Sequence, residues 1–467
     1  MGKHHCQRLI GNPLRASFLA DWLRMLLLLV AALLSWSTAA LGKGEIRLVN
    51  DPETSDLLDQ LGEPLVQAAG LPAGSVHFHV ILETSLNAFA LENGNIFFNS
   101  GLLQAARGRE ELAGVIAHEV AHLSAGHHIK IKDKAKNLSL TSLLATVVGI
   151  AAGVATGDSS ISQGAILGGA ASTQTALLSD LRQKERQADR LAVLYLSKTG
   201  LDPQGIANFL ERIHREQRLS TLPPPYLLSH PISTQRLSEA RDLAQQHPPT
   251  QRRADTESAW LVRVQAKLEA GLGSDPAATA QRFEQQLQGN SDPKEIFPIR
   301  YGLALARRYG GQLAEAETLL SELLEDHPQD PYLLRERGLV RMERNNLTEA
   351  RRDFETALEK LPDHQDLRYQ LASVLSEQKE YAKAGHLLRR LISEFPQNPR
   401  PFYLLGLVEG QMGRPGHSHL ALARHHRLQG EEETALWHYR EAARRFPPDS
   451  PERKITRDEA DLLEQKR

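Results

Sequence analysis

A period of 34 residues in the second half of the chain constrains its fold more than any other feature. Prolines and small residues recur at this spacing in three registers: Pro328, Pro362 and Pro396; Gly338, Ala372 and Gly406; Ala316, Ala350 and Ala384. In the last of these registers, each alanine is followed by apolar residues at +4 and +7 and by proline at +12. Small residues let paired helices approach closely, and proline ends each second helix.

Two helices in each 34-residue unit are typical of tetratricopeptide repeats. The pattern returns near the end of the chain, at Ala435, Tyr439, Ala442 and Pro447. We therefore predict an α-solenoid of these repeats over residues 258–460, behind a linker at residues 247–257. An unrelated helical bundle is the alternative fold for this half.

Composition limits the kinds of site that the chain can build. Its 467 residues leave room for two or three domains. The net charge of −2 provides no global basic field, so we expect no nucleic-acid partner. Cys6 is the only cysteine, which excludes a disulfide framework or a thiolate metal site within the chain. Any metal site must therefore use His, Asp and Glu.

The N-terminal segment has the pattern of a secretory signal peptide. Basic residues such as Arg15 and Arg24 precede an apolar run at residues 25–34, and small residues follow at 37–42. We predict a signal peptide over residues 1–42, which implies export. An uncleaved membrane anchor is the alternative, although the apolar run is short for a bilayer span.

Residues 43–246 predict a mainly helical domain with a small β-sheet. Asn93-Gly94 between two apolar runs predicts a β-hairpin. Residues 138–175 read as an insertion that begins with an apolar, small-residue-rich run at 138–156. We expect this insertion to be a mobile lid or a membrane-touching loop, with a membrane-spanning helix as the alternative.

The chemistry of this domain is indicated by His118-Glu119-Val120-Ala121-His122, which fits the pattern H-E-x-x-H. Residues four apart share one face of a helix, so the two imidazoles can bind one zinc ion. Glu119 can take a proton from a water on that metal and is the expected general base. The surrounding helix is apolar, and burying these groups unpaired would cost several kcal/mol. The motif therefore predicts a zinc metalloendopeptidase.

Catalytic zinc usually has three protein ligands, and the sequence offers two candidates for the third. His128 has the spacing of the metzincin extension, but that extension needs glycine where this chain has Ala125. Glu185 lies on a separate predicted helix, with Asp189 one turn later on the same face. Glu185 can bind the metal while Asp189 hydrogen-bonds a ligand imidazole or supports proton transfer. We therefore expect Glu185 to be the third ligand and His127 and His128 to be helix-end residues.

Three motifs in order resemble those of the gluzincin family of HtpX and the CAAX prenyl proteases. They are His118-Glu119-x-x-His122, Glu185-x-x-Ala188-Asp189 and Ser229-His230-Pro231-x-x-x-x-Arg236. The resemblance spans the mature chain, because a periplasmic branch of this family carries C-terminal tetratricopeptide repeats. A cysteine pair that some relatives carry in the repeats is missing here, which puts redox-linked features in doubt and not the zinc site.

The resemblance implies one zinc ion per chain and a role for each matched residue. The zinc ligands would be His118, His122 and Glu185. Glu119 would be the general base, and Asp189 matches the position usually assigned as proton donor. His230 matches a family histidine that can take the fourth zinc position and hold the enzyme latent, with Arg236 in a supporting role.

The resemblance also implies a cellular location and a biological function. The chain would be a periplasmic endopeptidase, with chaperone-like activity, in the assembly and quality control of outer-membrane β-barrel proteins. Its partners would be unfolded or misassembled outer-membrane proteins, the barrel-assembly machinery through the repeats, and the lipopolysaccharide-transport barrel. Apart from the resemblance, a membrane-touching insertion would add peripheral membrane contact.

Two other functions remain open on the sequence. One is a largely latent protease that serves as a repeat-scaffold chaperone or adaptor. The other is a membrane-embedded protease, which requires residues 138–156 to span the bilayer.

Overall fold

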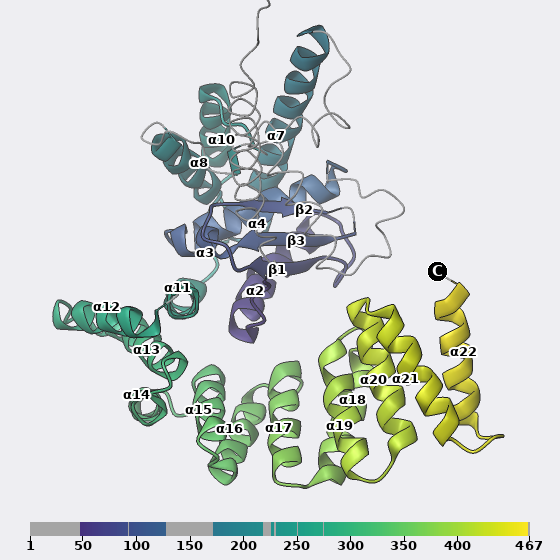
Figure 1. Cartoon of the computed structure of the whole chain (residues 1–467). Helices are drawn as coiled ribbons and strands as arrows, with labels where there is room; N and C mark the ends of the chain where they lie inside the picture. Colours follow the sequence, from purple (N-terminus) through teal and green to yellow (C-terminus); the bar gives the residue numbers. More distant parts are fainter. Residues whose placement is uncertain are drawn as a thin grey trace, which may run out of the picture. The chain divides into compact units, whose positions relative to one another are not determined.

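A computed structural model of the chain describes residues 47–91, 93–127, 171–217, 226–227, 230–249, 251–273 and 275–465. The predicted signal peptide at 1–42, most of the predicted insertion at 138–175, and His128 lie outside these residues. The described chain is mainly helical with one small sheet, as predicted (Figure 1). Within these ranges, no helix combines the length and the apolar character that a bilayer span requires.

The sheet has three strands in the order β1-β3-β2. Strands β2 (Ala88–Ala90) and β3 (Asn95–Asn99) pair antiparallel, which confirms the predicted hairpin. Gly94 in the turn has a φ of 81°, a left-handed conformation that glycine adopts without strain. Strand β1 (His77–Ile81) pairs parallel with β3 on its other side, an arrangement that the hairpin pattern did not predict.

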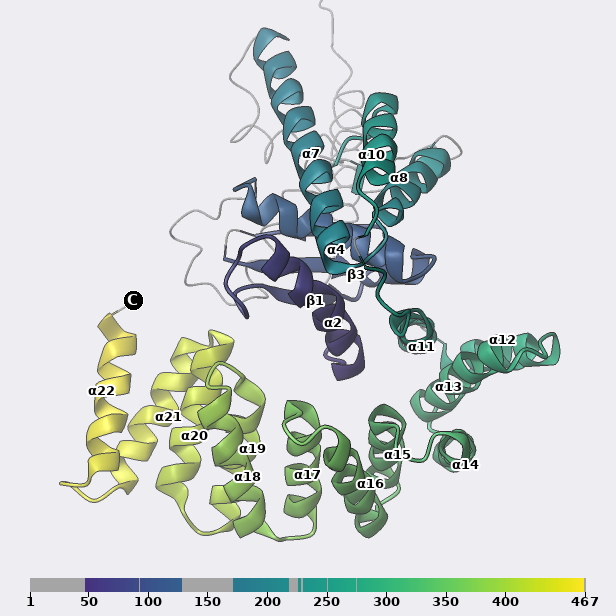
Figure 2. The ribbon, with the colours of Figure 1, turned by 180° about the vertical axis from the view of Figure 1, so that it is seen from behind.

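Helices cover this sheet and enclose one hydrophobic core with it. Their bounds are α2 (Pro52–Ala68), α3 (Ser100–Ala105), α4 (Arg109–Ser124), α7 (Ala171–Thr199), α8 (Gln204–Gln217) and α10 (Thr234–Gln246). Figure 2 shows α7, α8 and α10 gathered on one side of the sheet, with α4 between them and the strands. The sheet and these helices thus hold α4 in the interior of this half.

Helix α4 is the apolar helix on which the sequence placed the H-E-x-x-H motif. Glu110 and Glu111 occupy its first turn, where negative charge interacts favourably with the helix dipole. Gly126 follows the end of the helix with a φ of 71°. Every residue from 111 to 122 is buried, so the helix is enclosed on all sides. This burial carries the H-E-x-x-H residues into the core.

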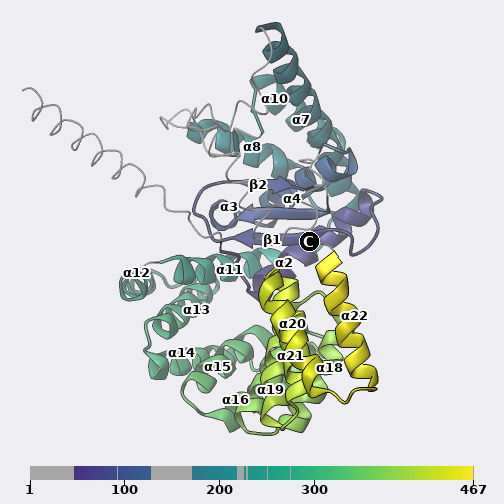
Figure 3. The ribbon, with the colours of Figure 1, turned by 45° about the vertical axis from the view of Figure 1, so that its right-hand side comes forward.

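The second half of the described chain is a run of helices. They are α11 (Glu257–Leu272), α12 (Pro276–Gln288), α13 (Pro293–Tyr309), α14 (Leu313–Asp326), α15 (Pro331–Glu343), α16 (Leu347–Lys360), α17 (Gln365–Glu377), α18 (Tyr381–Glu394), α19 (Pro399–Gln411), α20 (Pro415–Gln429), α21 (Glu432–Arg445) and α22 (Pro451–Gln465). Figure 3 shows helices α18 to α22 grouped at the C-terminal end of this run.

The periodic residues have the positions that a helical repeat predicts. The prolines that recur every 34 residues directly follow the second helix of a pair: Pro328 after α14, Pro362 after α16 and Pro396 after α18. A methyl group on Gly338 would lie 2.8 Å from the Phe354 ring, and one on Gly406 would lie 2.7 Å from Leu422. Small residues therefore permit the close contact between paired helices, and the predicted solenoid is confirmed.

Helix α11 belongs to both halves of the structure. Its Leu261 and Val264 lie in the hydrophobic core of the first half, and its Ala266 and Ala270 lie in the core of the repeats. Since one helix supplies side chains to two cores, the repeats begin directly on the folded first half.

Candidate metal centre and active site

Two imidazoles meet on one face of helix α4. His118 and His122 are one helical turn apart, and their Nε2 atoms are separated by 3.1 Å. His118 is fully buried and His122 is 7% exposed. The buried position of α4 thus directs two nitrogen donors to one point inside the protein.

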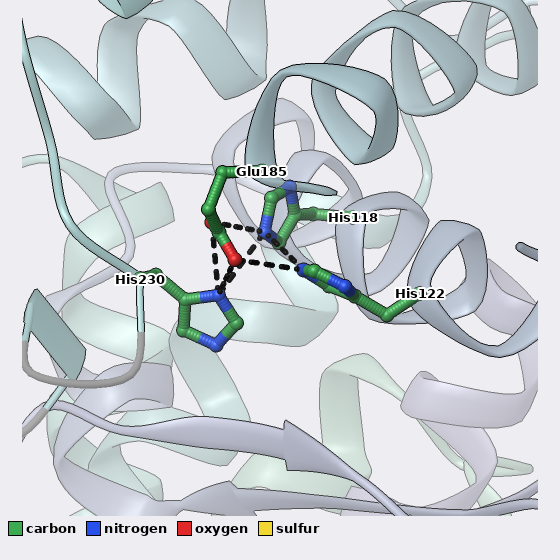
Figure 4. Close-up of side chains that lie close together, drawn as sticks. All are labelled: His118, His122, Glu185 and His230. Atoms are coloured by element: carbon green, nitrogen blue, oxygen red, sulfur yellow. Dashed lines mark hydrogen bonds and ion pairs between the residues drawn. The ribbon is translucent and has the colours of Figure 1, made fainter. Parts of the chain in front are cut away.

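Glu185 of helix α7 and His230 of the segment before α10 complete the group (Figure 4). The Glu185 carboxylate oxygens lie 3.4 Å from His118 Nε2 and 3.3 Å from His122 Nε2. His230 Nδ1 lies 3.1 Å from both of these oxygens and 3.3 Å from His118 Nε2. Figure 4 shows the four side chains pointing toward one another, two of them from α4 and one each from α7 and the segment before α10.

These four buried side chains fit a metal ion. Their donor atoms all lie within 4.8 Å of one another, so the group could hold a cation. A tetrahedral site with metal–nitrogen bonds of about 2.0–2.1 Å separates its donor atoms by about 3.4 Å. The observed separations of 3.1–3.4 Å between His118, His122, Glu185 and His230 agree with that spacing.

The electrostatics of the group also favour a positive charge at its centre. Burial acts to lower the pKa of His118, but the carboxylates of Asp189 and Glu185 outweigh it and raise that pKa to about 9. Burial likewise acts to raise the pKa of Glu185, but His230 and Arg236 hold it well below its ordinary range. Two carboxylates therefore stay ionised around the imidazoles, and a bound cation would balance them.

Glu119 lies beside this group. Its side chain is buried, and its Oε1 atom has no hydrogen-bond partner within the described part of the chain. His230 Nε2 lies 3.5 Å from this oxygen. A buried carboxylate oxygen without a donor is costly unless a water or substrate group reaches it, which suits a proton acceptor.

Asp189 and Arg236 contact the members of this group and each other. Asp189 Oδ1 lies 3.0 Å from His118 Nδ1, and Arg236 donates to both Asp189 oxygens at 2.5 and 2.9 Å. Arg236 also lies 2.8 Å from a Glu185 oxygen. Burial acts to raise the pKa of Asp189, but Arg236 and His118 lower it to about 2. Of the two roles that the sequence suggested for Asp189, this geometry suits the orientation of a ligand imidazole, because Asp189 Oδ1 contacts His118 Nδ1.

The sequence-predicted residues thus come together from three segments far apart in the chain. The structure gathers His118, Glu119, His122, Glu185, Asp189, His230 and Arg236. His127 lies beside His122, with ring centroids 5.6 Å apart, and is outside the group of four donors.

Sequence reasoning missed Tyr226. Its ring stacks on His230 at 4.6 Å, and its backbone N–H donates to the Leu86 carbonyl. This contact ties the His230 segment to the chain just before strand β2. The preceding sequence, Thr221-Leu222-Pro223-Pro224-Pro225, indicates a helix break but not what the next tyrosine contacts.

Comparisons with known proteins agree with both halves. Residues 52–255 match the model of Peptidase family M48, and residues 301–351 and 341–407 match Tetratricopeptide repeat models. The "Beta-barrel assembly-enhancing protease" of Yersinia pestis is 27% identical over 373 residues, which cover 78% of this chain and 74% of that protein. Its namesake in Escherichia coli strain K12 is 26% identical over 401 residues, which cover 84% and 80%.

A further relative is similar over a shorter stretch. "Metalloprotease LoiP" of Escherichia coli strain K12 is 31% identical over 170 residues, which cover 36% of this chain and 62% of that protein. The metallopeptidase domain and the repeats that the motifs predicted are therefore confirmed.

Proposed function

Since the chain carries a peptidase family M48 domain followed by tetratricopeptide repeats and is a metalloendopeptidase, we propose that it is a zinc enzyme of the periplasm that acts on outer-membrane β-barrel proteins. The observation that carries the enzymatic part is the buried meeting of His118, His122 and Glu185 beside Glu119. The outer-membrane part is supported by the names of the relatives, to which this chain is similar over most of their length.

In this proposal His118, His122 and Glu185 hold one zinc ion. Bound there, zinc would polarise a peptide carbonyl and acidify a water molecule. Glu119 accepts the proton of the attacking water at its free Oε1 atom and passes it to the leaving amine. Asp189, fixed by Arg236, holds the His118 ring through Nδ1 and so presents Nε2 to the metal.

His230 favours a second, compatible function, that of a latent protease acting as a chaperone or adaptor. Its Nδ1 atom lies against Glu185 and its Nε2 atom faces Glu119. The imidazole therefore occupies the space between the base and the metal ligands, where a water or a substrate carbonyl would bind. We propose that the chain rests in this latent state and that the repeats, residues 258–460, engage unfolded outer-membrane proteins and the barrel-assembly machinery.

Replacing Glu119 with glutamine tests the catalytic proposal. Glu119→Gln keeps the shape of the side chain but cannot accept a proton, so cleavage of an unfolded outer-membrane protein should fall at least about 100-fold. Zinc content, measured by metal analysis, should stay at one ion per chain, whereas Glu185→Gln should lower it. Glu216→Gln, on the exposed part of α8, is the matched control and should cleave normally. Unchanged cleavage by a homogeneous Glu119→Gln preparation would refute the role.

Replacing His230 with alanine tests the latent state. His230→Ala removes the imidazole between Glu119 and Glu185, so peptidase activity should rise while zinc content stays constant. Suppression of aggregation of the same unfolded substrate should persist in Glu119→Gln if the chain also works as a chaperone. If His230→Ala cleaves no faster than the parent chain, the latch does not exist.

A further inference from the structure

A second group of histidines lies in the repeats, away from the proposed catalytic centre in the sequence. Five of the 19 histidines fall within residues 417–438, on helices α20 and α21. His419 and His426 are seven residues apart on α20, which places them two turns apart on one face. His438 of α21 contacts both of them.

The geometry of this group is specific. His419 Nδ1 lies 3.0 Å from His438 Nδ1, and the two rings are inclined by 44°. The His438 ring also stacks on His426, with centroids 5.2 Å apart and planes within 14° of parallel. The Trp437 ring lies 5.6 Å from His419 and is largely exposed. Two nitrogen donors from neighbouring helices thus face each other at a half-buried contact.

We propose that His419 and His438 form a second metal site, which takes a late first-row divalent cation such as Ni²⁺, Cu²⁺ or Zn²⁺. Imidazole nitrogen is a ligand that these ions prefer. With metal–nitrogen bonds of about 2.0–2.1 Å, two nitrogens 3.0 Å apart subtend about 91–97° at the metal, close to a right angle. Square-planar and octahedral coordination use this angle, so Ni²⁺ and Cu²⁺ fit without movement of either helix.

Both imidazoles are available as ligands at neutral pH. Burial, with His419 and His426 close by, lowers the pKa of His438 to about 4. Burial and the charge of Arg445 lower the pKa of His419, while Glu441 acts in the opposite direction. Neutral imidazoles carry the free electron pair that a metal needs, and a cation would replace the single proton that the two Nδ1 atoms can share.

The polar and charged neighbours of the pair are already engaged with one another. His426 Nδ1 bonds the Glu431 carboxylate at 2.7 Å, and Glu441 pairs with Arg444 and Arg445. Water therefore completes the site, and its affinity rests on the two imidazoles. A cation held there would link α20 to α21 and stiffen the end of the solenoid.

Nickel titration followed by tryptophan fluorescence tests this site. The untagged full-length chain, preloaded with zinc, is titrated with Ni²⁺, and Trp437 emission should be quenched with saturation near one equivalent. The signal should be absent in Trp437→Phe. His419→Asn and His438→Asn should each lose the quenching, whereas His417→Gln, an exposed histidine on the same helix, should retain it.

Two outcomes would overturn the proposal. One is the absence of saturable quenching in the parent chain, and the other is undiminished quenching in both asparagine variants. Circular dichroism melting without Ni²⁺ shows whether each variant folds, and if His438→Asn does not, His419→Asn decides the question. Equilibrium dialysis gives an independent readout, since the asparagine variants should bind one Ni²⁺ fewer per chain.

Discussion

Asp189 lies between an imidazole of α4 and a guanidinium of α10, and all three side chains are almost fully buried. A buried carboxylate is stable only when its charge is compensated and its oxygens are bonded. Arg236 meets both needs, because it donates to both Asp189 oxygens and also reaches Glu185. Arg236 thus fixes the proposed metal ligand Glu185 and also Asp189, which orients a second proposed ligand, His118.

Replacing Asp189 with asparagine should therefore weaken the metal site without removing a ligand. Asp189→Asn keeps the volume but loses the charge that orients His118 and balances Arg236. We expect zinc affinity, measured by competition with a chelator, to fall about 10–100-fold. Asp242→Asn, an exposed change on α10, should leave it unaltered. Equal zinc affinity of the Asp189→Asn variant and the parent chain would show that the contact does not orient the ligand.

How much of the site could be read from the sequence depends on spacing. His118 and His122 were predicted because one helical turn dictates their proximity, whatever the tertiary fold. Glu185 needed a choice between two candidates, and His230 needed a family resemblance. Tyr226 gave no signal, because its stacking on His230 and the bond of its backbone N–H to the Leu86 carbonyl are tertiary contacts, which no local periodicity records.

At the scale of elements, the position of α4 depends on its close contact with α8. A methyl group on Gly114 of α4 would lie 2.7 Å from the backbone nitrogen of Ile206, and one on Gly205 would lie 2.0 Å from the Glu110 carbonyl oxygen. Both obstacles are backbone atoms, which cannot rotate away as a side-chain tip can. The helices therefore pack at a distance that only glycine permits.

Gly114→Ala should push α4 and α8 apart. Overpacking of this kind costs about 1–3 kcal/mol, and the loss should appear as a lower thermal midpoint. Because His118 lies one turn after Gly114, zinc affinity should fall as well. Gly271→Ala is the matched control in a helix, since its added methyl group meets only Tyr309 at 3.9 Å and should be neutral or stabilising. A thermal midpoint that Gly114→Ala leaves unchanged would show that the helices can separate freely.

The sequence predicted elements better than their arrangement. The 34-residue period gave the helix pairs of the solenoid, because each pair repeats the same local packing problem. Asn93-Gly94 gave the β2–β3 hairpin, because a tight turn fixes its own strands. The parallel pairing of β1 with β3 escaped prediction, since it joins His77 to Asn95 across a connection that runs through β2.

At the scale of the whole molecule, a buried cluster of charges joins α2 to the repeats. Lys267 of α11 lies 2.6 Å from Asp51, 3.3 Å from Glu53 and 2.8 Å from Glu336 of α15. The Tyr301 hydroxyl of α13 donates to Glu53 at 2.7 Å. Periodicity could not predict this cluster, because bonded members such as Tyr301 and Glu53 are 248 residues apart and each looks like an ordinary polar or charged residue.

Glu336 gives this cluster a defined pH dependence. Burial acts to raise its pKa, but Lys267, Arg335 and Arg308 outweigh burial and hold the pKa far below its ordinary value of 4.5. In the unfolded chain the carboxyl titrates near that ordinary value. The stabilising contribution of ionised Glu336 is therefore fully present above about pH 5 and is lost progressively as pH falls below 4.5.

Glu336→Gln should remove this contribution, leaving Lys267 and Arg335 short of a partner inside the protein. Breaking a buried charge cluster costs about 3–5 kcal/mol, so the urea midpoint at pH 7 should fall clearly. Below pH 4.5 the variant should lose stability less steeply than the parent chain, because one depressed carboxyl no longer takes up a proton on unfolding. Glu343→Gln removes a half-exposed partner of the same Arg308 and should cost less than about 1 kcal/mol. Urea titrations of both variants, run in parallel with chelator at pH 7 and pH 4, compare their losses of stability. Equal losses for Glu336→Gln and Glu343→Gln would mean that burial of Glu336 does not strengthen its ion pairs.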